Sequence, residues 1–412
     1  MARNLTEEQI PDSWKYDLLD NLTERVSGHT PSKSYPEYWN GGIKWISLAD
    51  TFRLDNGYLY ETDKEISQEG INNSSAQLHP AETVVLSRDA GIGKSGVMAE
   101  PMAVSQHFIA WKCDNEKKMN SWFLYNWLQF HKLEFERQAV GSTIKTIGLP
   151  FFKKLKIAAP PYKEQHKIAK ILSTWDRAIS TTERLIDNSK QQKKALMQQL
   201  LTGNKRFSIY SENWLSDSLE NIVGKIYGGG TPSRNEPRYW SGKIPWVTVK
   251  DLVSHRISGA QEHITESGLS NSSANIVPAG TVIIATRMAL GKAVISECDV
   301  AINQDLKAIC NSDKVTSSFL HYWFILHSDQ IERMGTGSTV KGIQLESIKS
   351  LKMTLPRSLE EQDKIASVLI NADNEIELLE QQLADLKLGK KALMQQLLTG
   401  KRRVKIDDKE IA

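Results

Sequence analysis

The stretch Gly91-Ile-Gly-Lys-Ser95 ends as a phosphate-binding loop does, with a lysine and a hydroxyl that would contact nucleotide phosphates and magnesium. That motif requires a glycine five positions before Gly93, and position 88 is an arginine. A related stretch, Leu290-Gly-Lys-Ala293, lacks the hydroxyl that would bind magnesium. The sequence therefore does not predict a nucleotide triphosphatase.

A second stretch, Ala159-Pro-Pro-Tyr162, is similar to the Asn/Asp-Pro-Pro-Tyr motif with which amino-methyltransferases hold a flipped base. The leading residue of that motif accepts a hydrogen bond from the amine, and Ala159 has no polar side-chain atom. The corresponding stretch later in the chain, Thr354-Leu-Pro-Arg357, departs further. Neither is preceded by a glycine-rich cofactor fingerprint, so methyl transfer by this chain is not predicted.

Metal and thiol chemistry are also not predicted. Cys113, Cys298 and Cys310 are isolated, without the Cys-x-x-Cys spacing of zinc sites or a disulfide framework, which fits a reducing compartment. The nine histidines are scattered, and His321 and His327 are too far apart to share a helix face. The run Asp114-Asn-Glu-Lys-Lys118 could form a nuclease-like acidic set, but its counterpart Asn311-Ser-Asp-Lys314 lacks the pattern, so the run is interpreted as a charged surface.

Basic, amide and hydroxyl side chains beside glycine-rich turns are the remaining candidates, and their chemistry suits DNA. Arginine and glutamine can pair with base edges, while lysine and hydroxyl groups can contact phosphates. Each could also be a solvated turn residue or a capping hydroxyl. The candidates are Lys33, Arg88, Lys94, Gln106, Ser142, Thr143 and Lys145, and then Arg234, Arg287, Lys292, Gln304, Ser338, Thr339 and Lys341.

These candidates fall into two sets because the chain is an internal repeat. The eleven residues 193–203 recur without change as 390–400. Glu164-Gln-His-Lys-Ile-Ala169 returns as Glu361-Gln-Asp-Lys-Ile-Ala366, and Gly141-Ser-Thr-Ile-Lys145 as Gly337-Ser-Thr-Val-Lys341. Each copy is expected to contain a globular region of about 160 residues followed by a helix of about 40.

The globular regions are predicted to be α+β. Residues 83–87 and 281–285 are apolar and β-branched, as in buried strands, and turn residues separate the segments around them. Segments 119–138 and 315–334 carry apolar residues at helical spacing and are predicted to face the core. The recurring tryptophans Trp39, Trp45, Trp240 and Trp246 are interpreted as core residues rather than base-stacking platforms.

Two long helices are predicted from heptad spacing. Ile365, Leu369, Ala372, Ile376, Leu379, Leu383 and Leu386 form one apolar seam. The other contains Ile168, Leu172, Trp175, Ile179, Thr182 and either Leu185 or Ile186. The net charge is +3 over 164–201 and −3 over 361–398, which favours pairing of the two helices with each other. A pseudo-two-fold relation between the copies would make the pair antiparallel.

The sequence after each helix predicts a nearly cyclic arrangement. Residues 201–209 lead from the first helix into the second globular region, and residues 398–406 begin the same passage before the chain ends. Ser13-Trp14 would then be equivalent to Asn213-Trp214 and would continue the passage that begins at 398. The two ends of the chain are expected to lie close together.

Composition leaves function open. The 412 residues carry a net charge of +3, with 25% charged and 40% hydrophobic residues, as in an ordinary globular chain. Locally, residues 153–206 have 13 basic and 4 acidic side chains, which suits an acidic partner. No apolar run is long enough to span a membrane and no secretory signal core is present, so we expect a cytoplasmic protein without a membrane partner.

Taken together, the motifs resemble those of the specificity subunit of type I restriction–modification systems. The resemblance covers the whole chain. It consists of the Gly-x-Thr-Pro-Ser…Tyr-Trp…Ile-x-Trp openings that start at Gly28 and Gly229, the Gly-Ser-Thr-x-Lys elements, Glu-Gln-x-Lys-Ile-Ala and the repeated eleven residues. The first opening is slightly irregular, with His29 where the second has Gly230.

The resemblance implies two target-recognition domains, 1–160 and 205–357, that each read one half of a bipartite asymmetric sequence in double-stranded DNA. It also implies a central conserved helix (161–204), a distal conserved helix (358–403) and a tail (404–412), with the helices packed as an antiparallel coiled coil that sets the spacing. The chain would be non-catalytic and bind no cofactor. Methyltransferase subunits would dock on the helices, for example at Trp175, Arg177, Lys194 and Gln198.

In the same complex, a restriction subunit would join through the assembly. The partner subunits would use S-adenosylmethionine, ATP and Mg. Two alternatives stay open at this point: an autonomous DNA adenine methyltransferase, and a coiled-coil scaffold without a nucleic-acid role.

Overall fold

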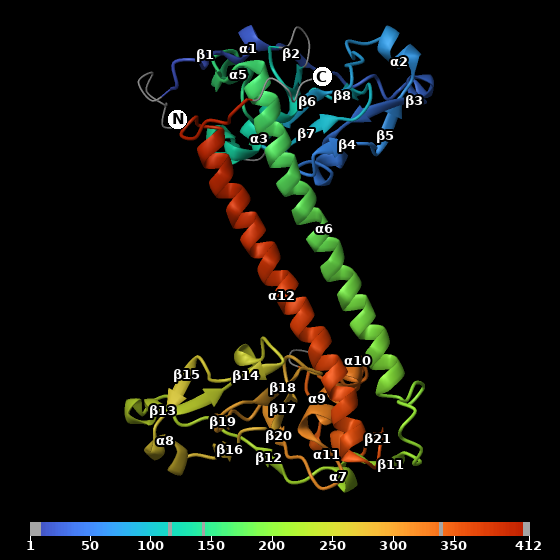
Figure 1. Ribbon diagram of the computed structural model, residues 1–412, viewed down its shortest axis with the longest axis vertical. Coiled ribbons are helices and arrows are strands. Elements are labelled where there is room, and N and C mark those ends of the chain that lie inside the picture. The colour runs from blue at the N-terminus through green and yellow to red at the C-terminus, as the bar shows by residue number, and fades with distance from the viewer. Residues whose placement is uncertain (1–9, 114–117, 142–144, 338–340, 407–412) are drawn as a thin grey trace. The chain divides into compact units, whose positions relative to one another are not determined.

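The computed structural model describes residues 10–113, 118–141, 145–337 and 341–406. The chain divides into two compact units, each of which is described by itself. The first contains residues 1–183 and 382–412, and the second contains residues 184–381. The division passes through both long helices, α6 (Tyr162–Leu200) and α12 (Leu359–Leu397), so each unit contains the beginning of one helix and the end of the other (Figure 1).

The first unit is built on a five-stranded sheet with the order β2-β9-β6-β7-β4. Its strands are β2 (Glu24–Ser27), β9 (Phe108–Lys112), β6 (Thr83–Ser87), β7 (Ser95–Met98) and β4 (Tyr58–Leu59). A second sheet has the order β5-β3-β8, with β5 (Lys64–Ile66), β3 (Trp39–Ile46) and β8 (Ala103–Val104). β1 (Lys15–Leu18) and β10 (Lys156–Ala159) form an antiparallel pair.

Helices and helical turns complete the first unit. They are α1 (Leu19–Leu22), η2 (Pro36–Tyr38), η3 (Leu48–Phe52), α2 (Gln68–Asn72), α3 (Ser121–Phe130), α4 (Lys132–Gln138) and α5 (Leu149–Lys153). The largest core cluster joins β6 and β9 to α3 and to both long helices, through Trp111, Phe123, Leu172 and Leu397. α6 and α12 are therefore part of the core of this unit.

The second unit repeats this plan. Its five-stranded sheet has the order β12-β20-β17-β18-β14, with β12 (Ile226–Gly228), β20 (Leu306–Ile309), β17 (Val282–Ala285), β18 (Ala293–Ser296) and β14 (Arg256–Ile257). The smaller sheet, β15-β13-β19-β16, contains β15 (Glu262–Ile264), β13 (Trp240–Val247), β19 (Val300–Ile302) and β16 (Ile276–Val277). β11 (Leu215–Ser218) pairs with β21 (Lys352–Leu355).

The helical elements of the second unit correspond to those of the first. They are α7 (Leu219–Ile222), η4 (Pro237–Tyr239), η5 (Val249–Asp251), α8 (Glu266–Ser270), α9 (Ser317–Leu326), α10 (Ser328–Met334) and α11 (Leu345–Lys349). The α+β class predicted from the sequence is confirmed, as are the buried strands β6 and β17. Each predicted core helix is instead two helices, because the backbone turns at His131 and at His327.

The predicted tryptophan core is confirmed for Trp45 and Trp246, which are buried, whereas Trp39 and Trp240 are only partly buried. Trp39 packs edge-on against Trp45 at a ring distance of 5.2 Å, and Trp240 packs in the same way against Trp246 at 5.1 Å. The indole nitrogen of Trp45 donates to the His29 carbonyl at 3.0 Å. These contacts pack the four rings against the small sheets, with Trp39 and Trp240 on the partly exposed side.

Within each unit the two long helices run antiparallel. In the first unit Lys390 pairs with Asp176 at 2.5 Å and Lys387 with Glu183 at 2.8 Å, so the numbering falls along one helix as it rises along the other. In the second unit Lys190 pairs with Glu380 at 2.6 Å, and Lys193 pairs with Asp373. Ile186 is buried and Leu185 is exposed, which identifies Ile186 as the seam residue.

The repeated Glu-Gln motif attaches each long helix to its globular region. The Gln362 side chain accepts a hydrogen bond from the Thr316 amide at 2.9 Å and donates to the carbonyls of Lys314 and Pro356, both at 2.8 Å. Gln165 makes the same three contacts, with Asn120, Lys118 and Pro160. Both side chains are buried, so this motif is structural.

The glutamate before each of these glutamines binds an arginine that follows the end of the other long helix. Glu164 is buried and accepts two hydrogen bonds from Arg403, at 2.7 and 2.6 Å. Glu361 accepts two from Arg206, at 2.9 and 2.8 Å. Because Arg403 follows α12 and Glu164 begins α6, the end of the chain closes the first unit.

The glycine that ends each helix takes part in this closure. Gly203 and Gly400 have φ of 75° and 71°, which a glycine adopts without strain. Gly203 lies against the Trp214 ring, and Gly400 lies against Pro11 and the Trp14 ring. The expected equivalence of Trp14 and Trp214 is confirmed, and Gly400 lies beside Pro11. Residues 1–9 and 407–412 lie outside the described residues, so the predicted closeness of the two ends stays a prediction.

Candidate nucleic-acid interface

The turn after the central buried strand is closed by the same backbone bond in both units. In the first, the Ser87 amide donates to the Lys94 carbonyl at 2.8 Å; in the second, the Ala285 amide donates to the Lys292 carbonyl at 3.0 Å. These bonds make positions 87 and 94 equivalent to 285 and 292. The turns between them, 88–93 and 286–291, lie at the end of each five-stranded sheet.

The two predicted lysines of these turns have a structural contact. The Lys94 ammonium donates to the Thr51 carbonyl at 3.1 Å, and the Lys292 ammonium donates to the Leu252 carbonyl at 3.3 Å. Each lysine therefore joins the turn to the loop around η3 or η5. An ammonium has three donors, so a phosphate contact by either lysine stays a prediction.

Each lysine contact also positions an apolar side chain that the sequence reasoning missed. The residue after Thr51 is Phe52, whose side chain is 67% exposed, and the residue after Leu252 is Val253, which is 83% exposed. No repeated motif marks these positions. They could have been found only by aligning the two copies through the structure.

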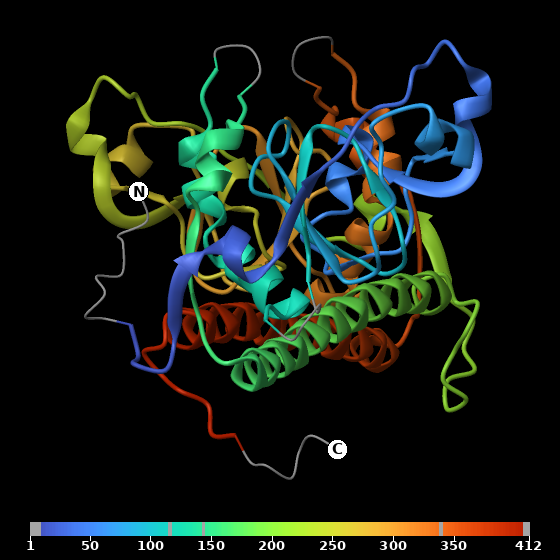
Figure 2. The ribbon, with the colours of Figure 1, turned by 90° about the horizontal axis from the view of Figure 1, so that it is seen from above.

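A hairpin stands beside each turn. Val140 and Thr146 form an antiparallel bridge, and the Ile147 amide donates to the Arg88 carbonyl at 2.9 Å. In the second unit Thr336 bridges to Gly342, and the Ile343 amide donates to the Thr286 carbonyl at 3.0 Å. Figure 2 shows the two arms of each hairpin side by side, teal in the first unit and orange in the second.

Four predicted contacts come from the Gly-Ser-Thr-x-Lys elements. Ser142, Thr143, Ser338 and Thr339 lie outside the described residues. Lys145 and Lys341 are described and exposed at the hairpin bases. The structure thus brings Lys145 close to the turn that contains Arg88, and Lys341 close to the turn that contains Arg287.

The two predicted arginines do not occupy equivalent positions. The Arg88 amide donates to the His107 carbonyl at 3.0 Å, and the Thr286 amide donates to the Asp305 carbonyl at 2.8 Å. Position 88 is therefore equivalent to 286, and 89 to 287. Arg287 takes the place of Asp89. The backbones of the two turns also differ, because a positive φ lies at Gly91 in the first turn and at Met288 in the second.

The predicted glutamines are linked to the Thr-Pro-Ser motif. The Thr30 hydroxyl donates to the Gln106 side-chain carbonyl at 2.5 Å, and Thr231 does the same to Gln304 at 2.6 Å. Both glutamines are exposed, and each keeps its amide nitrogen for another acceptor. The repeated threonine therefore orients an exposed amide in each unit.

The predicted basic residues after that motif differ between the units. Lys33 is exposed. Arg234 pairs with Glu262 at 2.5 Å and lies 3.8 Å from the centre of the Trp240 ring. The hydrogen bond from Arg234 lowers the pKa of the Glu262 carboxyl. Because this arginine already has an acidic and an aromatic partner, its predicted DNA contact would have to compete with both.

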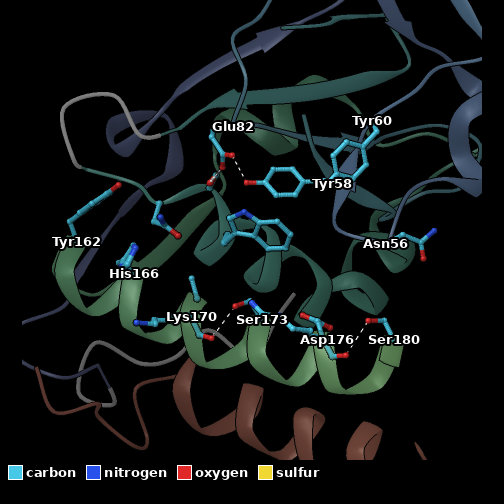
Figure 3. A pocket seen from close by; sticks show the side chains of 15 residues that line it. Asn56, Tyr58, Tyr60, Glu82, Tyr162, His166, Lys170, Ser173, Asp176 and Ser180 are labelled. Atoms are coloured by element: carbon cyan, nitrogen blue, oxygen red, sulfur yellow. Dashed lines mark hydrogen bonds between the residues drawn. The ribbon is translucent and has the colours of Figure 1, made fainter. Parts of the chain in front are cut away.

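A groove of about 950 Å³ lies in the first unit, between the five-stranded sheet region and α6 (Figure 3). Tyr58, Tyr60 and Trp122 form its aromatic side, and His166, Lys170 and Arg177 are among the α6 residues that line it. Glu82 fixes the aromatic side by accepting hydrogen bonds from the hydroxyls of Tyr58 and Ser121, both at 2.5 Å. Burial is the main reason why the pKa of Tyr58 is raised.

The four residues predicted to contact partner subunits lie on α6. Arg177 is exposed and lines the groove, while Lys194 and Gln198 are exposed in the second unit's part of the helix. Trp175 packs on Gly389 of α12, where an added Cβ would lie 2.7 Å from its ring. That contact places Trp175 in the helix seam, with part of the ring still accessible.

The stretches that resembled catalytic motifs have structural roles. Ala159 is paired with Lys15 in the β1–β10 ladder, and the Pro160 carbonyl accepts from Gln165 at 2.9 Å. Within the described ranges, no group of histidine, cysteine and acidic side chains could hold a metal ion. The three cysteines, Cys113, Cys298 and Cys310, are free thiols. Among the described helices, none is both long and apolar enough to cross a bilayer.

Comparison with known proteins gives a consistent result. The family model described as type I restriction modification DNA specificity domain matches residues 11–189 and again residues 212–388. A type I restriction enzyme specificity subunit of Methanocaldococcus jannaschii is 25% identical over 425 residues, covering 96% of this chain and 95% of that protein. The specificity subunit of an Escherichia coli type I restriction enzyme is 25% identical over 278 residues, covering 63% of this chain and 65% of that protein.

A solved structure shares the fold. The crystal structure of the S subunit of a type I restriction–modification system from M. genitalium aligns with a TM-score of 0.59 at 16% identity. The alignment covers 94% of this chain and 96% of that one.

Proposed function

Because the chain belongs to the type I restriction–modification DNA specificity family, with two matched domains that include most of its residues, we propose that it selects the DNA sequence on which such a system acts. Each unit reads one half of a bipartite target in double-stranded DNA. The observation that carries this proposal is one scaffold present twice with different side chains at equivalent turn positions, Asp89 in one and Arg287 in the other. A repeated fold with different side chains at its turns suits a DNA target whose two halves differ in sequence.

Recognition in this proposal takes place at the turn and hairpin at the end of each five-stranded sheet. Lys145, Lys341 and the exposed glutamines supply donors to phosphates and base edges. The lysine–carbonyl contacts of Lys94 and Lys292 keep these loops in one arrangement. A preformed surface lowers the entropic cost of binding.

The chain itself is proposed to be non-catalytic and to bind no cofactor. Methyltransferase and restriction subunits would supply the chemistry and would use S-adenosylmethionine, ATP and Mg. The complex would act in the cytoplasm. The incomplete motifs support this division of labour, since Ala159 has no polar side-chain atom and position 88 is an arginine.

The long helices are proposed to dock the methyltransferase subunits and to fix the spacing between half-sites. Arg177, Lys194 and Gln198 are exposed on α6 without a described partner, and they would lie at this interface. Spacing can be tested by inserting seven residues at matched points of α6 and α12. At 1.5 Å per residue the insertion adds about 10.5 Å, about three base pairs of B-DNA. An unchanged spacer would refute the role of the helices as a ruler.

The function is tested by exchanging residues 205–357 for those of a family member with a different target. The chimaera is co-expressed with its methyltransferase subunit, and methylated sites are mapped across the genome. We expect one half of the target to change and the other to persist. Change in both halves would contradict independent reading, and methylation without sequence preference would contradict the function. Methylation by the purified chain alone would instead indicate an autonomous enzyme.

A further inference from the structure

Position 89 of the first unit and the equivalent position 287 of the second carry side chains of opposite charge. The backbone bonds that make position 88 equivalent to 286 also place Asp89 with Arg287 and His107 with Asp305. In the first unit the acid is on the turn and its partner follows β8. In the second the acid follows β19 and the base is on the turn. The acid is thus on the turn in the first unit and beside the turn in the second.

In the first unit the acidic residue of this pair, Asp89, is bound by side chains of the neighbouring loops. The Asp89 carboxylate is 2.5 Å from Nδ1 of His107 and accepts a hydrogen bond from the Thr146 hydroxyl of the hairpin. Its side chain is 14% exposed. Asp89 is therefore a positioning residue that ties the turn to the hairpin.

In the second unit the turn residue is accessible. The Arg287 side chain is 61% exposed, and its Nη1 is 3.9 Å from Oδ1 of Asp305, beyond hydrogen-bonding distance. Gly342 replaces Thr146, so the hairpin offers no hydroxyl at this point. Within the described part of the chain the Arg287 guanidinium makes no hydrogen bond. Its planar set of N–H donors, called the fork below, is therefore available to a ligand.

Asp305 is held beside this fork. Its amide donates to the Asn303 side-chain carbonyl at 3.1 Å, and its carboxylate accepts from the Asn303 amide nitrogen at 3.0 Å. A fixed carboxylate at this distance orients the arginine and makes the site less favourable for a phosphate, because both are negative. The nearby Lys307 has its pKa lowered by burial and by Arg287.

We propose that Arg287 is a specificity-determining residue that reads a guanine in the half-site contacted by the second unit. An arginine fork donates to O6 and N7 of guanine, and the paired cytosine presents a donor in the same groove that a carboxylate can accept. Arg287 and Asp305 together match a G·C pair, whereas Asp89 and His107 do not offer this fork. The inference rests on the proposed function.

The test uses the complex assembled with its methyltransferase subunit and duplexes in which each guanine of the second half-site is replaced, one at a time, by 7-deazaguanine. This base keeps O6 and lacks the N7 acceptor. For the wild type we expect about a tenfold loss of affinity at one position, within the range of a bidentate contact. In Arg287→Ala the same replacement should cost less than twofold.

Two further variants distinguish base reading from structure and charge. Arg287→Lys keeps the charge without the fork and should bind with little discrimination at that position. Arg256→Ala is the matched control, because Arg256 also lies 3.9 Å from a carboxylate, that of Glu297, at the sheet edge formed by β14. It should retain the full 7-deazaguanine effect.

The outcomes separate this inference from the function on which it rests. If the wild-type complex does not discriminate any sequence, the proposed function fails. If it discriminates both half-sites but the 7-deazaguanine losses are equal in wild type and Arg287→Ala, only the role of Arg287 is overturned. A second half-site without any G·C pair would overturn it as well.

Discussion

Replacing Gln362 by alanine tests the attachment of α12 to the second globular region. The substitution removes three hydrogen bonds of a buried side chain and leaves the Thr316 amide and the carbonyls of Lys314 and Pro356 without that partner. An unsatisfied buried group costs about 1–3 kcal/mol, and the two carbonyls can regain water in part. We therefore expect a loss of about 3 kcal/mol in the free energy of unfolding of the second unit.

The loss can be measured by calorimetry together with hydrogen exchange. For a unit of about 200 residues, a change of 3 kcal/mol lowers Tm by roughly 6–12 °C. Exchange should accelerate in peptides that contain Thr316 and the first turn of α12. The control is Gln198→Ala, an exposed glutamine in the same unit, which should change stability by less than about 0.5 kcal/mol.

An isosteric change sharpens the result. Gln362→Glu keeps one acceptor but turns the donor into an oxygen that faces two carbonyls, each 2.8 Å away. The folded state then raises the pKa of the introduced carboxyl above its unfolded value. Stability is present at low pH and is lost as pH rises, so this variant should be less stable at pH 7 than at pH 5. If Gln362→Ala and Gln198→Ala unfold alike, the motif is not the attachment described above.

Other variants probe further contacts. Burial lowers the pKa of His321 to about 3, below its unfolded value, so the second unit should lose stability as pH falls below about 6.5, by up to about 1.4 kcal/mol per pH unit. His321→Gln should flatten this dependence in urea titrations at pH 7 and 5. Deleting residues after Gly400 removes Arg403 and leaves Glu164 buried without it; faster exchange at the start of α6 would show this, and unchanged exchange would contradict it. Lys94→Met should loosen the loop at Thr51 and raise the rate at which a protease cuts it. Equal cutting rates in the variant and the wild type would contradict a stabilising role of the Lys94–Thr51 contact.

Much of the fold could be predicted because the determining signals are local and repeated. The heptad spacing of the apolar residues fixed the helix seam, and only the choice between Leu185 and Ile186 needed coordinates. Gly203 and Gly400 mark helix ends because a positive φ is required there. The passage after each helix predicted the closure, although the Glu164–Arg403 contact could not be known without the fold.

The candidate site was less predictable, because equivalence between the copies depends on backbone pairing. Matching residue types would align Arg88 with Arg287, whereas the hydrogen bonds align Arg88 with Thr286. The exposure of Phe52 and Val253 has no sequence signal, since apolar residues are usually predicted inside. Lys94 and Lys292 were found by their turn, but their carbonyl partners are distant in sequence.

The closing contact at the end of the chain has a consequence for synthesis. The second unit is one continuous segment, 184–381, and its residues are all present once position 381 has left the ribosome. The first unit needs residues 382–406, which are made after the second unit, to cover Glu164 and Trp14. At about 5–20 residues per second, the ribosome needs roughly 10–45 s to translate the intervening residues. During that interval the earlier-made half of the protein lacks Met394, Leu397 and Leu398, and the core side chains that these residues later contact stay in water.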